Sequence, residues 1–141
     1  MMRPPIGITN EPKWIRHCCK IHARAKDLLN GNTNLIEASI ALVPLMIWTR
    51  AESDPDLKVF RLLRDEFIGL PIGRERQYWA AHALAREDVK IRAVEDTWRE
   101  AAMQAARNLQ QKYAWSLEAR AELRQQAREA QRIRESIDRK G

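Results

Sequence analysis

The sequence predicts an all-α protein, a single-domain helical bundle of about four helices whose last helix extends as a charged C-terminal arm. Three observations support this prediction. Hydrophobic residues make up 45% of the 141 residues and recur at three- and four-residue steps, the period of an amphipathic helix. β-branched residues never alternate with polar ones over a useful length, so no strand is predicted. Finally, residues 74–140 contain neither glycine nor proline.

The first helix is predicted to begin after an irregular, proline-rich segment. Asn10 suits the N-cap position, and Pro12 suits the first turn. The following apolar residues share one face of a helix that ends at Asn30-Gly31. They are Trp14, Cys18, Ile21, Ala25, Leu28 and Leu29.

The second and third helices also have recognisable starts. Asn34, with Glu37 three residues later, has the pattern of a capping box. The helix that follows is apolar almost all round, which predicts the most buried element of the bundle. Ser53-Asp54-Pro55 is predicted to start the third helix, which ends in the turn at residues 69–73.

The last helical segment is too long for the bundle to cover. Its first half has a near-heptad apolar seam, formed by Leu84, Ile91, Trp98, Ala105 and Leu109. A continuous helix over residues 80–139 would be about 90 Å long. We therefore divide the chain into a helical bundle domain over residues 1–115 and a charged helical arm over 116–141. The arm must project, pair with another chain, or bend back near Trp115-Ser116.

Compartment and cofactors are inferred from what the chain lacks. The N-terminal residues have no secretory pattern, and the longest uncharged run, residues 38–49, is shorter than the roughly 20 residues of a membrane span. Adjacent Cys18 and Cys19 do not suit a disulfide with each other, which favours reduced thiols in the cytoplasm. Cys18 and His22 lack further ligands for a closed metal site. No metal, cofactor or membrane contact is expected.

The leading functional interpretation is a non-enzymatic protein that binds a protein partner or a second copy of itself. An immunity-type or regulatory inhibitor is one example of this class. The arm has a narrow apolar stripe flanked by Arg and Glu, the composition of a weak coiled-coil seam. The expected partner-binding residues are Leu117, Leu123, Ala127, Ala130, Ile133 and Ile137.

A first alternative is nucleic-acid binding by the basic side of the first helix. Basic residues follow three- and four-residue steps there and form a stripe that can track phosphates. They are Lys13, Arg16, Lys20 and Arg24. The competing interpretation is an ordinary solvated face of an amphipathic helix.

A second alternative comes from Arg76 and His82, which are separated by five residues. This arrangement resembles the R-x4–6-H motif of HEPN ribonucleases, which are small helical bundles. That resemblance implies His82 as general acid–base and Arg76 as the group that holds the scissile phosphate. Alternatively, Arg76 pairs with an acid, His82 is exposed, and the turn forms one structural unit with Trp79 packed over it.

A second resemblance rests on Leu28–Gly31, Ile36-Glu37-Ala38, and the L-P-x-G-x-x-R-x-x-W turn that begins at Leu70. Over residues 20–113 the chain is similar to a group of small bacterial proteins of unassigned function. The resemblance implies a bacterial, cytoplasmic helical domain and carries over no catalytic residue.

Overall fold

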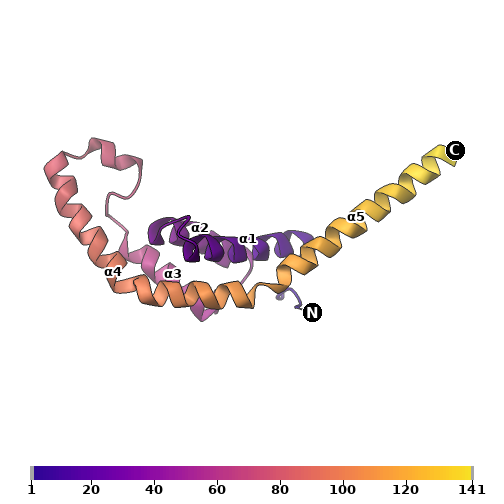
Figure 1. Ribbon diagram of the computed structural model, residues 1–141, viewed down its shortest axis with the longest axis horizontal. Helices are drawn as coiled ribbons and strands as arrows, with labels where there is room; N and C mark the ends of the chain where they lie inside the picture. Colours follow the sequence, from indigo (N-terminus) through magenta and orange to yellow (C-terminus); the bar gives the residue numbers. More distant parts are fainter. Residues whose placement is uncertain (1, 141) are drawn as a thin grey trace.

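The computed structural model describes residues 2–140, and within them the fold is all-α, as predicted. The elements are α1 (Glu11–Leu29), α2 (Leu35–Trp48), α3 (Pro55–Glu66), the short 3-10 helix η1 (Arg74–Tyr78), α4 (Ala81–Lys112) and α5 (Trp115–Lys140). Figure 1 shows a crescent: the first three helices pack along the second half of α4, while η1 and α5 rise from opposite ends on the same side.

The predicted helix starts are confirmed. The side chains of Asn10, Asn34 and Asp54 each accept a hydrogen bond of 2.8–3.1 Å from a backbone N–H in the following turn, which satisfies donors that the helix itself leaves free. The predicted capping box is only half formed, because the Glu37 carboxylate accepts instead from the Thr33 hydroxyl, at 3.0 Å.

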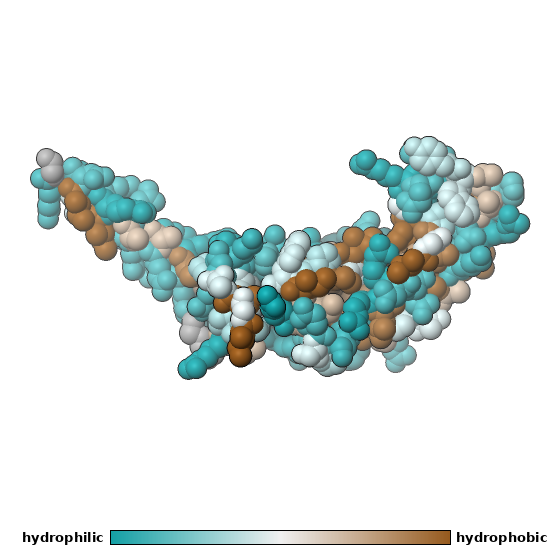
Figure 2. Space-filling view, turned by 180° about the vertical axis from the view of Figure 1, so that it is seen from behind, coloured by the Kyte–Doolittle hydropathy of each residue, from teal (hydrophilic) through white to brown (hydrophobic). Residues whose placement is uncertain are grey.

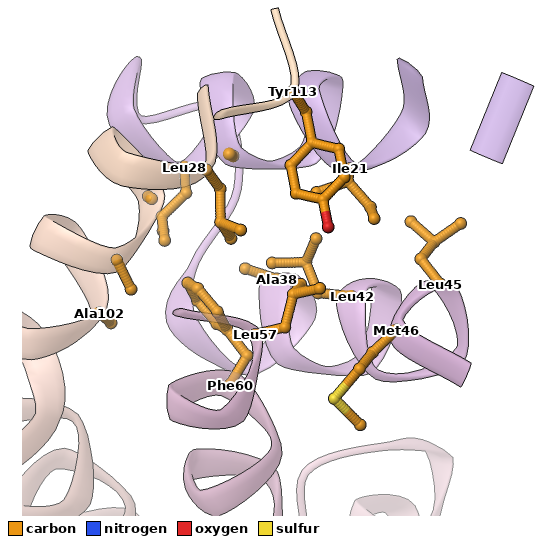
Figure 3. Packing of buried hydrophobic residues seen from close by; sticks show 14 of the residues in the cluster. Ile21, Leu28, Ala38, Leu42, Leu45, Met46, Leu57, Phe60, Ala102 and Tyr113 are labelled. Atoms are coloured by element: carbon orange, nitrogen blue, oxygen red, sulfur yellow. The ribbon is translucent and has the colours of Figure 1, made fainter. Parts of the chain in front are cut away.

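The core is built from one face of each of α1 to α4. Figure 3 shows side chains of α1, α2 and α3 converging, with Leu42 and Phe60 among those fully buried. However, α2 is not buried all round, although its composition predicts this. It packs on α1 and α3 and only slightly on α4, so its remaining side exposes Ile40, Ile47 and Trp48 by 45%, 53% and 55%.

The turn before α4 is held by polar contacts, and not by Trp79 as predicted. The Arg76 guanidinium donates to both carboxylate oxygens of Asp88, at 2.7 and 3.0 Å, and to the Pro71 carbonyl at 2.8 Å. The Glu75 carboxylate accepts the Gly73 N–H at 3.1 Å. Trp79, the extended residue that follows η1, is 39% exposed and is not among the side chains packed against the hydrophobic core.

The chain bends between α4 and α5, at Tyr113-Ala114. Although α5 begins close to the predicted boundary at residue 115, Ser116 and Ala119 are buried, so its first turns belong to the bundle. Every residue from Arg124 to Lys140 is exposed. The arm therefore projects, which is one of the three predicted outcomes. The projecting part begins near Arg124, and not at residue 116 as the predicted boundary has it.

Candidate functional site

The first turns of α5 cross the N-terminal half of α1, and two contacts fix the crossing. The rings of Trp14 and Trp115 pack with their centroids 5.1 Å apart. The Cys19 thiol donates to the Ser116 carbonyl at 3.1 Å, and joins residues 97 positions apart in the sequence. Leu123 packs on the same core from the next turns of α5. The two helices therefore meet at a defined point and diverge beyond it.

One side of this crossing is a groove of about 510 Å³ with basic walls. Cys19, Ala23, Leu123 and Ala127 contribute its small or apolar lining, and its α1 and α5 walls carry three and two basic residues respectively. They are Arg16, Lys20, Arg24, Arg120 and Arg124, and the groove lining includes no acidic residue. The arm continues the positive charge, since Arg124, Arg128 and Arg132 border the next hollow along α5.

The other side of the same crossing has the opposite charge. The hollow there is lined by Glu11 and Glu122 and has no basic residue. Leu123 lines both hollows. Basic and acidic residues alternate in the sequence, but the fold places the basic ones on one side of the crossing and the acidic ones on the other. An ordinary solvated surface has no need of this separation of charge.

Most of the basic groups in the groove are available to a ligand. Arg24 lies 3.4 Å from the Asp27 carboxylate, with both side chains well exposed; such a pair contributes little. Within residues 2–140, Arg16, Lys20, Arg120 and Arg124 make no ion pair. The basic side chains can bind the charged groups of an anionic chain, and the small or apolar residues between them can contact its uncharged parts.

A second hollow, of about 610 Å³, lies beside the same stretch of α1. Lys13, His17, Trp48, Arg50 and the acidic Glu52 line it, together with residues 7–10. The His17 and Trp48 rings pack with centroids 5.2 Å apart. Burial lowers the pKa of His17, and the neighbouring charges Lys20, Lys13 and Arg16 lower it further. His17 therefore sits at the centre of the basic stripe as a neutral ring at neutral pH.

The fold brings together some of the residues predicted to bind nucleic acid and some of those predicted to bind a partner. Arg16, Lys20 and Arg24 line the groove with Leu123 and Ala127, so residues from the nucleic-acid alternative and from the partner-binding stripe share one site.

Other members of those two sets lie elsewhere. Lys13 lies in the adjacent hollow. Ala130, Ile133 and Ile137 lie on the free arm, and Leu117 is 40% exposed, outside the groove lining. Arg120 and Arg124 were missed, because only the crossing of α5 over α1 makes them part of a site.

The remaining candidate chemistry has little geometric support. The Arg76 guanidinium is occupied by Asp88, as the non-catalytic interpretation predicted, and His82 is exposed. Burial, and then Cys19, raise the pKa of the Cys18 thiol to about 12, which leaves it protonated and unreactive. In the described part of the chain, no three His, Cys, Asp or Glu side chains come together to hold a metal. Both cysteines are free and buried.

Among residues 2–140 no helix has the length and apolar character of a membrane span. In comparisons with known proteins, no family model, no curated protein and no solved structure matches the chain.

Proposed function

We propose that this chain is a non-enzymatic, cytoplasmic protein that binds nucleic acid by placing phosphates in the basic groove between α1 and α5. The observation that supports this most strongly is the convergence of five basic residues from two helices on one side of their crossing, with the carboxylates of Glu11 and Glu122 on the other. Two free, buried cysteines support the cytoplasmic location.

Phosphate binding explains the groove better than a solvated face does. A protein that neutralises phosphates releases the counterions condensed on the nucleic acid, and this release provides most of the sequence-independent affinity. An isolated amphipathic helix would present only the basic residues of α1. Here α5 adds Arg120 and Arg124 to the opposite wall, so the groove can contact an anionic chain from both sides.

The test is a pair of variants with equal loss of charge. Arg16→Gln with Arg120→Gln removes one basic group from each wall of the groove. Lys58→Gln with Arg61→Gln removes two from α3, whose basic residues do not line the groove. We expect the groove variant to bind a mixed-sequence oligonucleotide at least tenfold more weakly than the wild type, and the α3 variant to bind nearly as the wild type does. Equal weakening by both variants would show only an effect of net charge.

A second candidate function, binding of a protein partner or a second copy by the arm, is supported by the exposed apolar stripe. Ile133 and Ile137 are 61% and 64% exposed, and Figure 2 shows a thin apolar line along the projecting arm, bordered by hydrophilic residues. Most of the stability of helices in proteins comes from packing of an amphipathic face, which the free part of α5 lacks, and pairing with another helix would supply it.

Truncation after Ala130 separates this second candidate from the first. It removes Ile133 and Ile137 but retains Arg120, Leu123, Arg124 and Ala127 in the groove. Truncation at the end of α4, after Tyr113, is unsuitable because it also deletes buried Ser116 and Ala119. If the arm mediates association, the shortened protein sediments as a smaller species and still binds nucleic acid. An unchanged sedimentation coefficient, after correction for mass, would exclude association through residues 131–141.

A further inference from the structure

The hollow beside Trp48 has the composition of a site for one unpaired base, next to the groove that holds phosphates. Trp48 is 55% exposed although it is large and apolar, and exposed aromatic side chains surrounded by cations are the stacking platforms of single-stranded nucleic-acid sites. The adjacent His17 ring, 5.2 Å away, holds Trp48 in position. Lys13 and Arg50 border the hollow together with one carboxylate, that of Glu52, so its two basic side chains outnumber its single acidic one.

The hollow and the groove are lined by neighbouring residues of α1, although no residue lines both. Lys13 and Arg16 lie three residues apart, as do His17 and Lys20, so they are neighbours on the helix surface. The charges of Lys13, Arg16 and Lys20 all act on the His17 ring. About two turns of α1, roughly 10 Å, separate Lys13 from Lys20, so a strand whose phosphates follow Arg16 and Lys20 passes close to the hollow that Lys13 and His17 line.

The backbone at Arg50 provides independent support. Arg50 has a φ of +57°, the left-handed conformation that glycine adopts most readily. It occupies the position after the cap of α2: its N–H donates to the Ile47 carbonyl at 3.1 Å, and the Ala51 N–H donates to the Met46 carbonyl at 2.9 Å. Glycine is the usual residue in this helix ending. An arginine there keeps a strained backbone and places a guanidinium at the rim of the hollow, over Gly7.

We infer that the hollow lined by Lys13, His17, Trp48 and Arg50 stacks one base of a single-stranded nucleic acid whose phosphates occupy the α1–α5 groove. This inference rests on the proposed function and narrows its ligand from nucleic acids in general to single strands. A base within a duplex is already stacked and paired, so its face is not free to pack on Trp48.

The experiment compares a short oligothymidylate with an abasic oligonucleotide of the same length, which keeps the phosphates and lacks the bases. Binding is measured by fluorescence anisotropy at one salt concentration. Trp48→Leu is the test variant, and Trp79→Leu, which replaces a tryptophan 39% exposed at the far end of the crescent, is the control. Thermal melting establishes that both variants remain folded.

We expect Trp48→Leu to bind oligothymidylate about 5- to 150-fold more weakly, the range associated with one stacked base, and to bind the abasic strand as the wild type does. Trp79→Leu should change neither affinity. If the wild type binds both strands equally, the stacking site is wrong and the groove proposal stands. If it binds neither strand, the groove proposal fails and this inference fails with it. If Trp48→Leu lowers the sedimentation coefficient instead, Trp48 belongs to a protein interface.

Discussion

Asp54 joins three parts of the fold, and its replacement tests how the bend before α5 is held. Its carboxylate caps α3 by accepting the Asp56 N–H at 2.9 Å. It also lies 2.8 Å from the Lys112 ammonium and accepts from the Tyr113 hydroxyl at 3.3 Å. Its side chain is only 8% exposed. Tyr113 ends α4 and precedes the turn into α5, so this one carboxylate anchors the point from which the arm departs.

The expected magnitude is the sum of two losses. Removing an Asp N-cap costs about 1 kcal/mol. Leaving the largely buried Tyr113 hydroxyl without its acceptor costs about 1–3 kcal/mol more. Asp54→Ala should therefore lower the free energy of unfolding by about 2–4 kcal/mol. Asp54→Asn keeps the cap and an acceptor for the hydroxyl, and Asp56 remains 2.8 Å from Lys112, so its loss should be below about 1 kcal/mol.

Urea denaturation followed by circular dichroism measures both variants. We expect the midpoint to fall in the order wild type, Asp54→Asn, Asp54→Ala, with the slope unchanged, since the slope reports the surface exposed on unfolding. A loss below about 0.5 kcal/mol for Asp54→Ala, the range of ordinary surface substitutions, would refute the anchoring role. Equal losses for the two variants would show that charge, and not capping, dominates.

The remaining predictions concern the core and the turn. Leu42→Asp should prevent folding, because an unpaired carboxylate in a fully buried position costs several kcal/mol; Ile40→Asp, on the exposed side of the same helix, should give soluble protein with cooperative melting. Soluble Leu42→Asp with an unchanged melting temperature would mean that the core is misplaced. Trp79→Ala should cost less than the roughly 3–5 kcal/mol of a fully buried tryptophan, and a loss within that range in urea titrations would contradict the exposed position of Trp79.

Local features of the fold could be predicted from the sequence because their causes are local. Asn10, Asn34 and Asp54 cap helices through side chains that reach donors two or three residues away. The α4 seam follows from a period of about seven residues, and Ala105 and Leu109 are buried where it places them. In each case the residue and its partner lie within one or two turns of the same helix.

Features that depend on contacts between distant segments could not be predicted. The groove exists because α5 crosses α1, and that crossing depends on Trp14 meeting Trp115 and on Cys19 meeting Ser116. The sequence indicates a break near Trp115-Ser116, close to the observed one at Tyr113-Ala114, but it does not indicate the direction in which α5 continues. The exposed side of α2 could not be predicted either, because it also depends on distant segments. Composition shows that a helix is apolar, but the number of helices packed around it decides how much of its surface is covered.

The salt dependence of binding tests the central claim most directly, because it counts the phosphates that the protein neutralises. Five basic groups in the groove predict a slope of log K against log[salt] of about −3.5 for a single strand. Replacing Arg16 and Arg120 together by Gln should reduce the slope to about −2.1, while replacing Lys58 and Arg61 should leave it unchanged. A wild-type slope near zero, or a slope that the groove variant does not alter, would contradict the assignment of the α1–α5 groove as the nucleic-acid site.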